Sequence, residues 1–159
     1  MAKNIELLEE AIRNRVERAR QNIITRHLQA GQKASGKTMQ SLRTEVKHDV
    51  QSIRATLWGR QFFQGLETGR AGGKAPSGFY KMIKQWSIDK GIQFERESQR
   101  NTFAYFVSRK IAKEGTLLYR KGGRNDIYTP EVESAYSDIQ DLVGERFTDV
   151  LMQSIKLNN

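Results

Sequence analysis

The strongest constraint on the fold is a change in the spacing of apolar residues along the first third of the chain. From residue 5 to residue 28 the apolar side chains recur every three or four positions: Ile5, Leu8, Ile12, Val16, Ala19 and Ile23. This spacing predicts an amphipathic helix that ends near Gly31. Residues 42–48 and 53–58 instead alternate between the two sides of an extended chain, which predicts an antiparallel hairpin with one wet face.

Helical spacing returns in the remaining two thirds of the chain. Residues 79–90 and 103–111 carry apolar stripes that end at Gly91 and Gly115, and residues 60–68 fit a short helix or an extended segment. Thr129 and Pro130 favour the start of a last helix. Its stripe consists of Val132, Tyr136, Ile139, Val143, Phe147 and Val150. We therefore predict an α+β fold in which long N- and C-terminal helices and two central helices pack on a small antiparallel sheet.

The length of 159 residues fits a single domain, which we take as residues 1–159. Glycine and proline predict a flexible loop near residues 69–78, and a basic glycine-containing connector near 115–128 is predicted to be flexible as well. The chain has no cysteine, which excludes disulfides, thiolate metal sites and cysteine nucleophiles. No apolar run approaches the length of a membrane span. We expect no membrane association and an origin in the cytoplasm.

The net charge of +9 is unevenly distributed along the chain. Residues 1–125 hold 25 Lys and Arg against 11 Asp and Glu, whereas residues 126–159 hold 2 against 7. A basic body can meet a polyanion such as DNA. Alternatively, the acidic arm can dock on basic surface of its own chain or of a neighbouring copy. The asymmetry favours this second interpretation.

Residues 31–38, GQKASGKT, match the nucleotide-binding P-loop pattern. A working P-loop needs a strand before the loop and a helix after it, so that backbone N–H groups can hold the phosphates. Here a helix is predicted before the loop and a strand soon after it. We therefore interpret the segment as a connection from helix to strand.

Other chemical patterns are weaker. Glu45 and Lys47 resemble the Glu-x-Lys of metal-dependent nucleases, which need a second carboxylate near the metal. No acidic residue lies between Glu17 and Glu45, and Glu17 belongs to the predicted first helix, so cross-strand charge pairing is expected. His27 and His48 lack metal-ligand spacing and are expected at the surface or an edge. Four acids of the last helix share a face that we expect to meet solvent or a basic partner: Asp138, Asp141, Glu145 and Asp149. We predict no catalytic, cofactor-binding or metal-binding residues and no enzymatic activity.

One segment, residues 109–124, is rich in positive charge. It carries six basic residues and a single acid, with Tyr119 among them. The basic residues are Arg109, Lys110, Lys113, Arg120, Lys121 and Arg124. Such a segment can contact phosphates and stack on a base. We favour an exposed hairpin or arm that meets a protein partner, and contact with a polyanion stays open.

Several short motifs occur in order along most of the chain. Residues 35–42 (SGKTMQSL) lead into the first strand, and residues 62–70 (FFQGLETGR) carry Glu-x-Gly after an aromatic pair. Residues 74–76 (KAP), 104–116 (AYFVSRKIAKEGT) and 128–131 (YTPE) follow. Together they resemble the tailed-bacteriophage neck proteins described as head–tail joining or tail-completion proteins. Thr38 and Met39 depart from the family's usual x-Leu.

The resemblance implies a virion structural protein that forms a homo-oligomeric ring at the head–tail junction. Its partners would be the portal or an adjacent connector and tail proteins, and it would be made in the host cytoplasm. The residues that match the motifs are then scaffold or interface candidates: Gly36, Glu67, Gly69, Arg70 and Pro76. Non-specific contact with packaged DNA stays open. The alternative is a basic DNA-binding module outside the virion.

Overall fold

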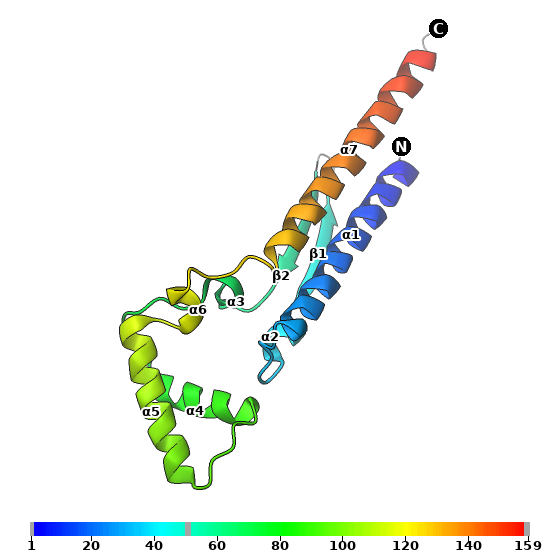
Figure 1. The fold of residues 1–159 in the computed structure, drawn as a ribbon. Helices are drawn as coiled ribbons and strands as arrows, with labels where there is room; N and C mark the ends of the chain where they lie inside the picture. The colour runs from blue at the N-terminus through cyan, green and yellow to red at the C-terminus, as the bar shows by residue number, and fades with distance from the viewer. Residues whose placement is uncertain (1, 50–51, 158–159) are drawn as a thin grey trace.

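The computed structural model describes residues 2–49 and 52–157 (Figure 1). Its elements are α1 (Ala2–Gln29), α2 (Lys37–Gln40), β1 (Arg43–His48), β2 (Ile53–Trp58), α3 (Gly65–Thr68), α4 (Phe79–Asp89), α5 (Glu97–Glu114), α6 (Leu117–Arg120) and α7 (Thr129–Leu157). The predicted α+β class is confirmed, because long helices accompany a two-stranded antiparallel sheet. The two terminal helices and the hairpin lie where the change of apolar spacing predicted them.

The body of the molecule consists of α1, α7 and the hairpin, which lie side by side in Figure 1. Strand β1 pairs with β2 so that Val46 faces Ala55 and Arg43 faces Trp58. The buried core joins Ile12 and Val16 of α1 to Val46 of β1. Three partly buried apolar residues pack against this core: Leu8, Ile53 and Ile139. The core is small and lies where α1 crosses the inner face of the hairpin.

A second unit, which we call the helical lobe, consists of α4 and α5 and lies at the opposite end of the molecule from the chain termini (Figure 1). Ala104 and Ile83 are buried between its helices. Arg100 donates a hydrogen bond to the buried Ser87 hydroxyl at 3.1 Å and lies 5.0 Å from the ring centre of Phe94. An ion pair between Lys84 and Glu97, at 2.6 Å, closes the outer edge of the lobe.

Helix α7 contacts the core less than its sequence stripe suggested. Ile139 packs against the core, but the other five residues of the stripe are 46–64% exposed: Val132, Tyr136, Val143, Phe147 and Val150. Small and polar residues of α7 face α1 instead, including Ala135, which lines a narrow hollow with Ala19. The described part of the chain therefore leaves most of this stripe uncovered.

Candidate functional site

Glu67 is a buried carboxylate at the centre of the molecule. It belongs to α3 and is 2% exposed. Its Oε1 atom accepts hydrogen bonds from the backbone N–H groups of Ile127, Tyr128 and Thr129 at 2.7, 2.6 and 3.1 Å. Its Oε2 atom accepts a hydrogen bond from the Thr129 hydroxyl at 2.5 Å. One side chain thus satisfies three successive backbone donors from a segment 60 positions further along the chain.

These hydrogen bonds determine where α7 begins. The carbonyl of Tyr128 accepts the first helical bond, from the Val132 N–H at 3.0 Å. A helix starts with unpaired N–H groups and a partial positive charge, which a carboxylate stabilises. Pro130 supplies no N–H, and Glu67 accepts that of Thr129. Glu67 therefore acts as the capping group of α7 although it lies in a different element.

The environment of Glu67 keeps its side chain ionised. Burial raises the pKa of its carboxyl, but the hydrogen bonds from the Thr129 hydroxyl and from three backbone N–H groups lower it further than burial raises it. The net pKa lies below the ordinary value of 4.5. Burial raises the pKa of the Tyr128 phenol, and the negative charge of Glu67 adds to the rise.

Glycines allow the segments around Glu67 to approach backbone to backbone. Gly69 has φ of +69°, and a Cβ there would lie 2.5 Å from the Tyr119 nitrogen and 2.6 Å from Thr116 Oγ1. Gly115 has φ of +82°, and its Cβ would lie 2.7 Å from the Arg70 carbonyl oxygen. Both positions require glycine for two reasons. Their positive φ disfavours any residue with a side chain, and the neighbouring atoms leave no room for a Cβ. We call residues 67–70, 115–124 and 127–129 together the Glu67 junction.

Hydrogen bonds tie the two sides of the junction together. The Thr116 N–H donates to the Arg70 carbonyl at 2.8 Å, and the Arg70 N–H donates to the Thr116 hydroxyl at 3.0 Å. The Arg124 N–H donates to the Glu67 carbonyl at 2.8 Å. The connector near 115–128 therefore contains α6 and is bonded at both ends. Its flexibility stays a prediction.

Arg70 and Pro76 shape the loop that follows the junction. The Arg70 guanidinium donates to the carbonyls of Ala71 and Lys74 at 3.2 and 3.0 Å and lies 4.9 Å from the ring centre of Phe79. Pro76 is exposed, and its carbonyl accepts a hydrogen bond from the Phe79 N–H at 3.1 Å. Arg70 thus holds the start of α4 against the junction.

Gly36 lies outside the junction, in the segment that matches the P-loop pattern. It is buried, has φ of +80°, and precedes the four-residue helix α2. The element before the loop is α1, and β1 follows α2. The strand–loop–helix order that holds phosphates is therefore not the order at this position. Gly36 turns the chain from helix towards strand.

The six basic residues of 109–124 fall into two groups. The first group, Arg109, Lys110 and Lys113, lies on α5, where all three are exposed. In the second group, Arg120 of α6 pairs with Glu114 at 3.2 Å. The predicted hairpin or arm is wrong, because the segment forms the end of α5, the short helix α6 and the hydrogen-bonded connector. Helical spacing up to Ile111 was the signal that α5 extends this far.

The other basic residues lie near α6 and the junction. Lys121 is exposed after α6, whereas Arg124 forms two bonds to the Asp126 carboxylate at 2.6 and 2.8 Å. Hydrogen bonding to that carboxylate raises the pKa of Arg124, burial opposes the rise, and the charges of Asp126 and Glu67 add to it. Arg120 and Arg124 thus already have acidic partners within the chain.

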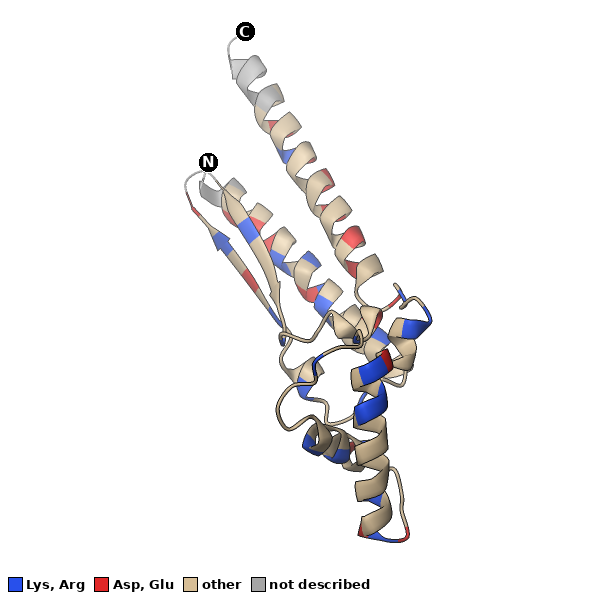
Figure 2. Ribbon diagram, turned by 90° about the vertical axis from the view of Figure 1, so that its left-hand side faces the viewer, with Lys and Arg blue, Asp and Glu red and all other residues tan. Residues whose placement is uncertain are grey.

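The outer face of α5 combines positive charge with aromatic side chains. Tyr105 and Phe106 are exposed there beside Arg109, whose guanidinium donates to the Tyr105 hydroxyl at 3.0 Å. Ala104 and Ser108, which are buried, face the other way. Figure 2 shows Lys and Arg along α5, and Asp and Glu along α7 at the other end of the molecule. Helix α5 is thus rich in positive charge and α7 in negative charge, whereas α1 and the hairpin, which lie beside α7, carry both signs.

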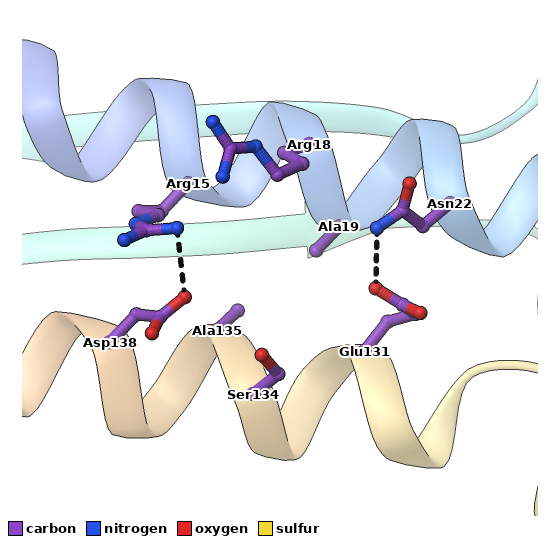
Figure 3. A pocket seen from close by; sticks show the side chains of 8 residues that line it. All are labelled: Arg15, Arg18, Ala19, Asn22, Glu131, Ser134, Ala135 and Asp138. Carbon is purple, nitrogen blue, oxygen red and sulfur yellow. Dashed lines mark hydrogen bonds and ion pairs between the residues drawn. The ribbon is translucent and has the colours of Figure 1, made fainter.

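Part of the acidic arm docks on the chain's own α1. Asp138 pairs with Arg15 at 3.1 Å, and Glu131 accepts from Arg26 at 2.6 Å and from Asn22 at 2.8 Å. Figure 3 shows Arg15, Asn22, Glu131 and Asp138 around a hollow between α1 and α7. The hollow has a volume of about 110 Å³. The prediction that acids of the last helix meet a basic partner is confirmed for Asp138, whose partner is intramolecular.

The two histidines occupy different environments. His27 is only 4% exposed, so its expected surface position is wrong: α1 turns it inward, where its Nδ1 lies 3.3 Å from Gln32 Oε1. Burial lowers the pKa of His27, opposed by the contact with Gln32 and assisted by the charge of Lys90. His48 is exposed and lies 2.5 Å from Glu9. Among the described residues, no cluster of three or more His, Asp or Glu could hold a metal ion.

Glu45 pairs with Lys47 along the same strand, at 2.8 Å, and accepts a hydrogen bond from Trp58 Nε1 across the hairpin at 3.1 Å. The expected cross-strand charge pair is therefore wrong, because the cross-strand partner is an indole. Residues two apart on a strand point to the same face, so the long Lys47 side chain can reach Glu45. None of the described helices is long and apolar enough to cross a membrane.

Known proteins offer no match to set beside this geometry. No family model matches the chain, and neither the curated proteins nor the solved structures contain a match to it. The fold is that of an α+β protein with a two-stranded sheet, and its function is argued below from its own surfaces.

Proposed function

We propose that this protein is a structural subunit that assembles with copies of itself, and that the assembly is a ring at the head–tail junction of a tailed phage. The observation that carries the proposal is the uncovered apolar stripe of α7. Soluble monomers rarely leave large contiguous apolar patches exposed, and such patches mark interaction surfaces. The excess of basic residues on α5 and of acidic residues on α7 supports pairing of unlike elements. Head-to-tail pairing closes into rings when the rotation permits.

The place in the virion rests on the resemblance of the ordered motifs. Three of the motif residues, Glu67, Gly69 and Arg70, lie in the Glu67 junction and have structural contacts there. Such contacts are compatible with the scaffold role that the resemblance implies. On this proposal the portal or an adjacent connector and tail proteins are the neighbours in the virion, and no catalytic residue is required.

Particle composition tests the proposal directly. Virions from the source of this sequence would be purified and probed with an antibody to the chain, and the neck would be imaged by electron microscopy. We expect the protein in purified particles and antibody label at the neck. Its absence from particles that carry a complete portal and tail would overturn the proposal.

A DNA-binding module is the second candidate, favoured by the exposed Arg109, Lys110 and Lys113 on one face of α5. Binding through phosphates would weaken steeply as salt rises. Fluorescence anisotropy with duplex DNA, for the wild type and for a variant with these three residues changed to Ala, tests it. Salt-sensitive binding that the triple variant loses would support this candidate, and no binding at low salt would remove it.

A further inference from the structure

We propose that the exposed stripe of α7 in one copy docks on the outer face of α5 in the next copy. This inference rests on the proposed self-assembly and names the two surfaces that would meet. The α7 face is defined as Val132, Tyr136, Val143, Phe147 and Val150. The α5 face is defined as Tyr105, Phe106, Arg109, Lys110 and Lys113.

Each set of residues forms a continuous face of its helix. Successive residues of an α-helix are rotated by about 100°, so the α7 spacings of four, seven, four and three keep all five side chains within roughly 60° of arc. They present two aromatic rings and three valines, and they are 46–64% exposed. The α5 residues follow a spacing of one, three, one and three on the side away from the buried Ala104 and Ser108.

The two faces complement each other in chemistry. Both offer exposed aromatic rings, which contribute large apolar area with few rotatable bonds. Glu133, which is exposed, borders the α7 stripe on the side of Phe147. Arg146 borders the other side and pairs with Asp149 at 3.9 Å, whereas Asp141 lies on the opposite side of the helix. Residues 126–159 hold two basic and seven acidic residues, whereas residues 70–124 hold thirteen basic and four acidic. The opposite net charges of these two segments favour encounter between unlike ends of two copies.

The two faces cannot meet within one chain in this fold. Helix α5 and the distal part of α7 lie at opposite ends of the molecule (Figure 1). Contact between them therefore requires two copies arranged head to tail. A symmetric pairing of two α7 helices would bring acidic elements together, and a pairing of two α5 faces would bring together three cations from each copy. Like charges oppose both of these arrangements.

Sedimentation velocity over a range of protein concentrations tests the inference. The variants Phe147→Ser and Phe106→Ser each remove one ring from one face, and Phe62→Ser is the control, because Phe62 is 72% exposed and belongs to neither face. We expect the wild type and the control to self-associate equally. Each face variant should associate at least about tenfold more weakly, with unchanged far-ultraviolet circular dichroism.

Mixing the two face variants distinguishes the head-to-tail arrangement from a symmetric one. Phe147→Ser keeps an intact α5 face and Phe106→Ser keeps an intact α7 face, so the mixture should form a one-to-one dimer that grows no further. Association lost in one variant only, or no dimer in the mixture, would overturn the inference. So would a wild type that stays monomeric at every concentration.

The sedimentation and mixing experiments test the docking of α7 on α5 separately from the role of the protein in the virion. A monomeric protein that is nevertheless found in virions would overturn the docking of α7 on α5 and leave the structural role standing. If Phe106→Ser weakens binding to duplex DNA but leaves association unchanged, nucleic acid is the occupant of the α5 face and the inference fails.

Discussion

Glu67 shows how one residue can determine the start of a distant helix. Its carboxylate is buried and bonded to Ile127, Tyr128 and Thr129, so removing it leaves backbone donors without partners in the interior. An unpaired buried donor costs about 1–3 kcal/mol. Gly69 and Gly115 are similarly important, because the backbone segments that meet there leave no room for a methyl group.

We expect Glu67→Ala to lower the free energy of unfolding by about 3 kcal/mol, since it removes the acceptor of one buried and two partly buried backbone donors. Glu67→Gln keeps an acceptor oxygen and should cost less. Urea denaturation followed by circular dichroism measures both. Equal stability of the wild type and the Ala variant would show that water or another group replaces the carboxylate.

The low pKa of Glu67 gives its contribution a definite pH dependence. The pKa is below 4.5 in the folded protein, so the stability that the carboxylate contributes is fully present above about pH 4.5 and is lost as pH falls through the folded value. We expect the stability gap between the wild type and Glu67→Gln to narrow as the solution is acidified below about pH 4.5. A gap that stays constant with pH would contradict the assignment of the ionised form.

Gly69→Ala should destabilise the protein strongly, by about 3 kcal/mol or more, because the new Cβ would meet a backbone nitrogen at 2.5 Å. Gly122→Ala is the matched control. Gly122 also has a positive φ, of +86°, but open space surrounds its Cβ position, so only the backbone strain of about 1 kcal/mol is expected. Thermal unfolding of the two variants separates the clash from the strain.

At the scale of elements, α1 serves as the surface against which the hairpin and α7 are arranged. Its apolar stripe meets the core, while Arg15, Asn22 and Arg26 meet acids of α7. The contact between the two long helices is therefore largely polar. This explains why α7 can keep an apolar stripe that points elsewhere.

We expect Arg26→Ala to lower stability by about 1 kcal/mol, because Glu131 is largely buried and would keep only Asn22 as a partner. Arg13→Ala is the control. Arg13 pairs with Glu9 along the exposed side of α1, and solvent-exposed pairs contribute little to stability, so Arg13→Ala should change it less than Arg26→Ala. Chemical denaturation of both variants measures the loss of stability in each. It compares an ion pair between two helices with an ion pair within one helix.

Spacing, turns and caps were enough to predict most elements, because these signals are local. Gly115 ends α5, and Thr129 with Pro130 opens α7, as their residue types indicate. The partners of Glu67 could not be predicted, because a contact over 60 positions depends on tertiary structure. The resemblance singled out Glu67 and Gly69 without giving their contacts. The burial of His27 and the exposure of Phe147 likewise depend on how helices pack, and a stripe alone does not say what covers it.

At the scale of the whole molecule, α5 carries an excess of positive charge and α7 an excess of negative charge (Figure 2). Both helices also carry exposed aromatic side chains. Charge attraction acts at long range, whereas apolar contact acts only on touching surfaces. A head-to-tail assembly of such subunits would combine fast encounter with contacts that resist salt.

We expect salt to slow self-association more than it weakens it. Raising the ionic strength from about 0.01 M to about 1 M shortens the screening length from roughly 30 Å to 3 Å, which removes the attraction between distant charges. Stopped-flow light scattering should show slower association, and sedimentation should show a smaller change in affinity. Complete dissociation in high salt would mean that charge alone holds the copies together.

The position of Glu67 also has a consequence for how the chain is made. A ribosome synthesises the basic first 125 residues before it reaches the segment that supplies partners to the Glu67 carboxylate. Until then the Glu67 carboxylate must stay hydrated, so the Glu67 junction cannot close. The core formed by α1 and the hairpin also still lacks Ile139. A nascent or truncated chain that stops before residue 127 is thus expected to remain open and to present apolar surface to chaperones and proteases. Completion of α7 would be the event that converts it into an assembly-ready subunit.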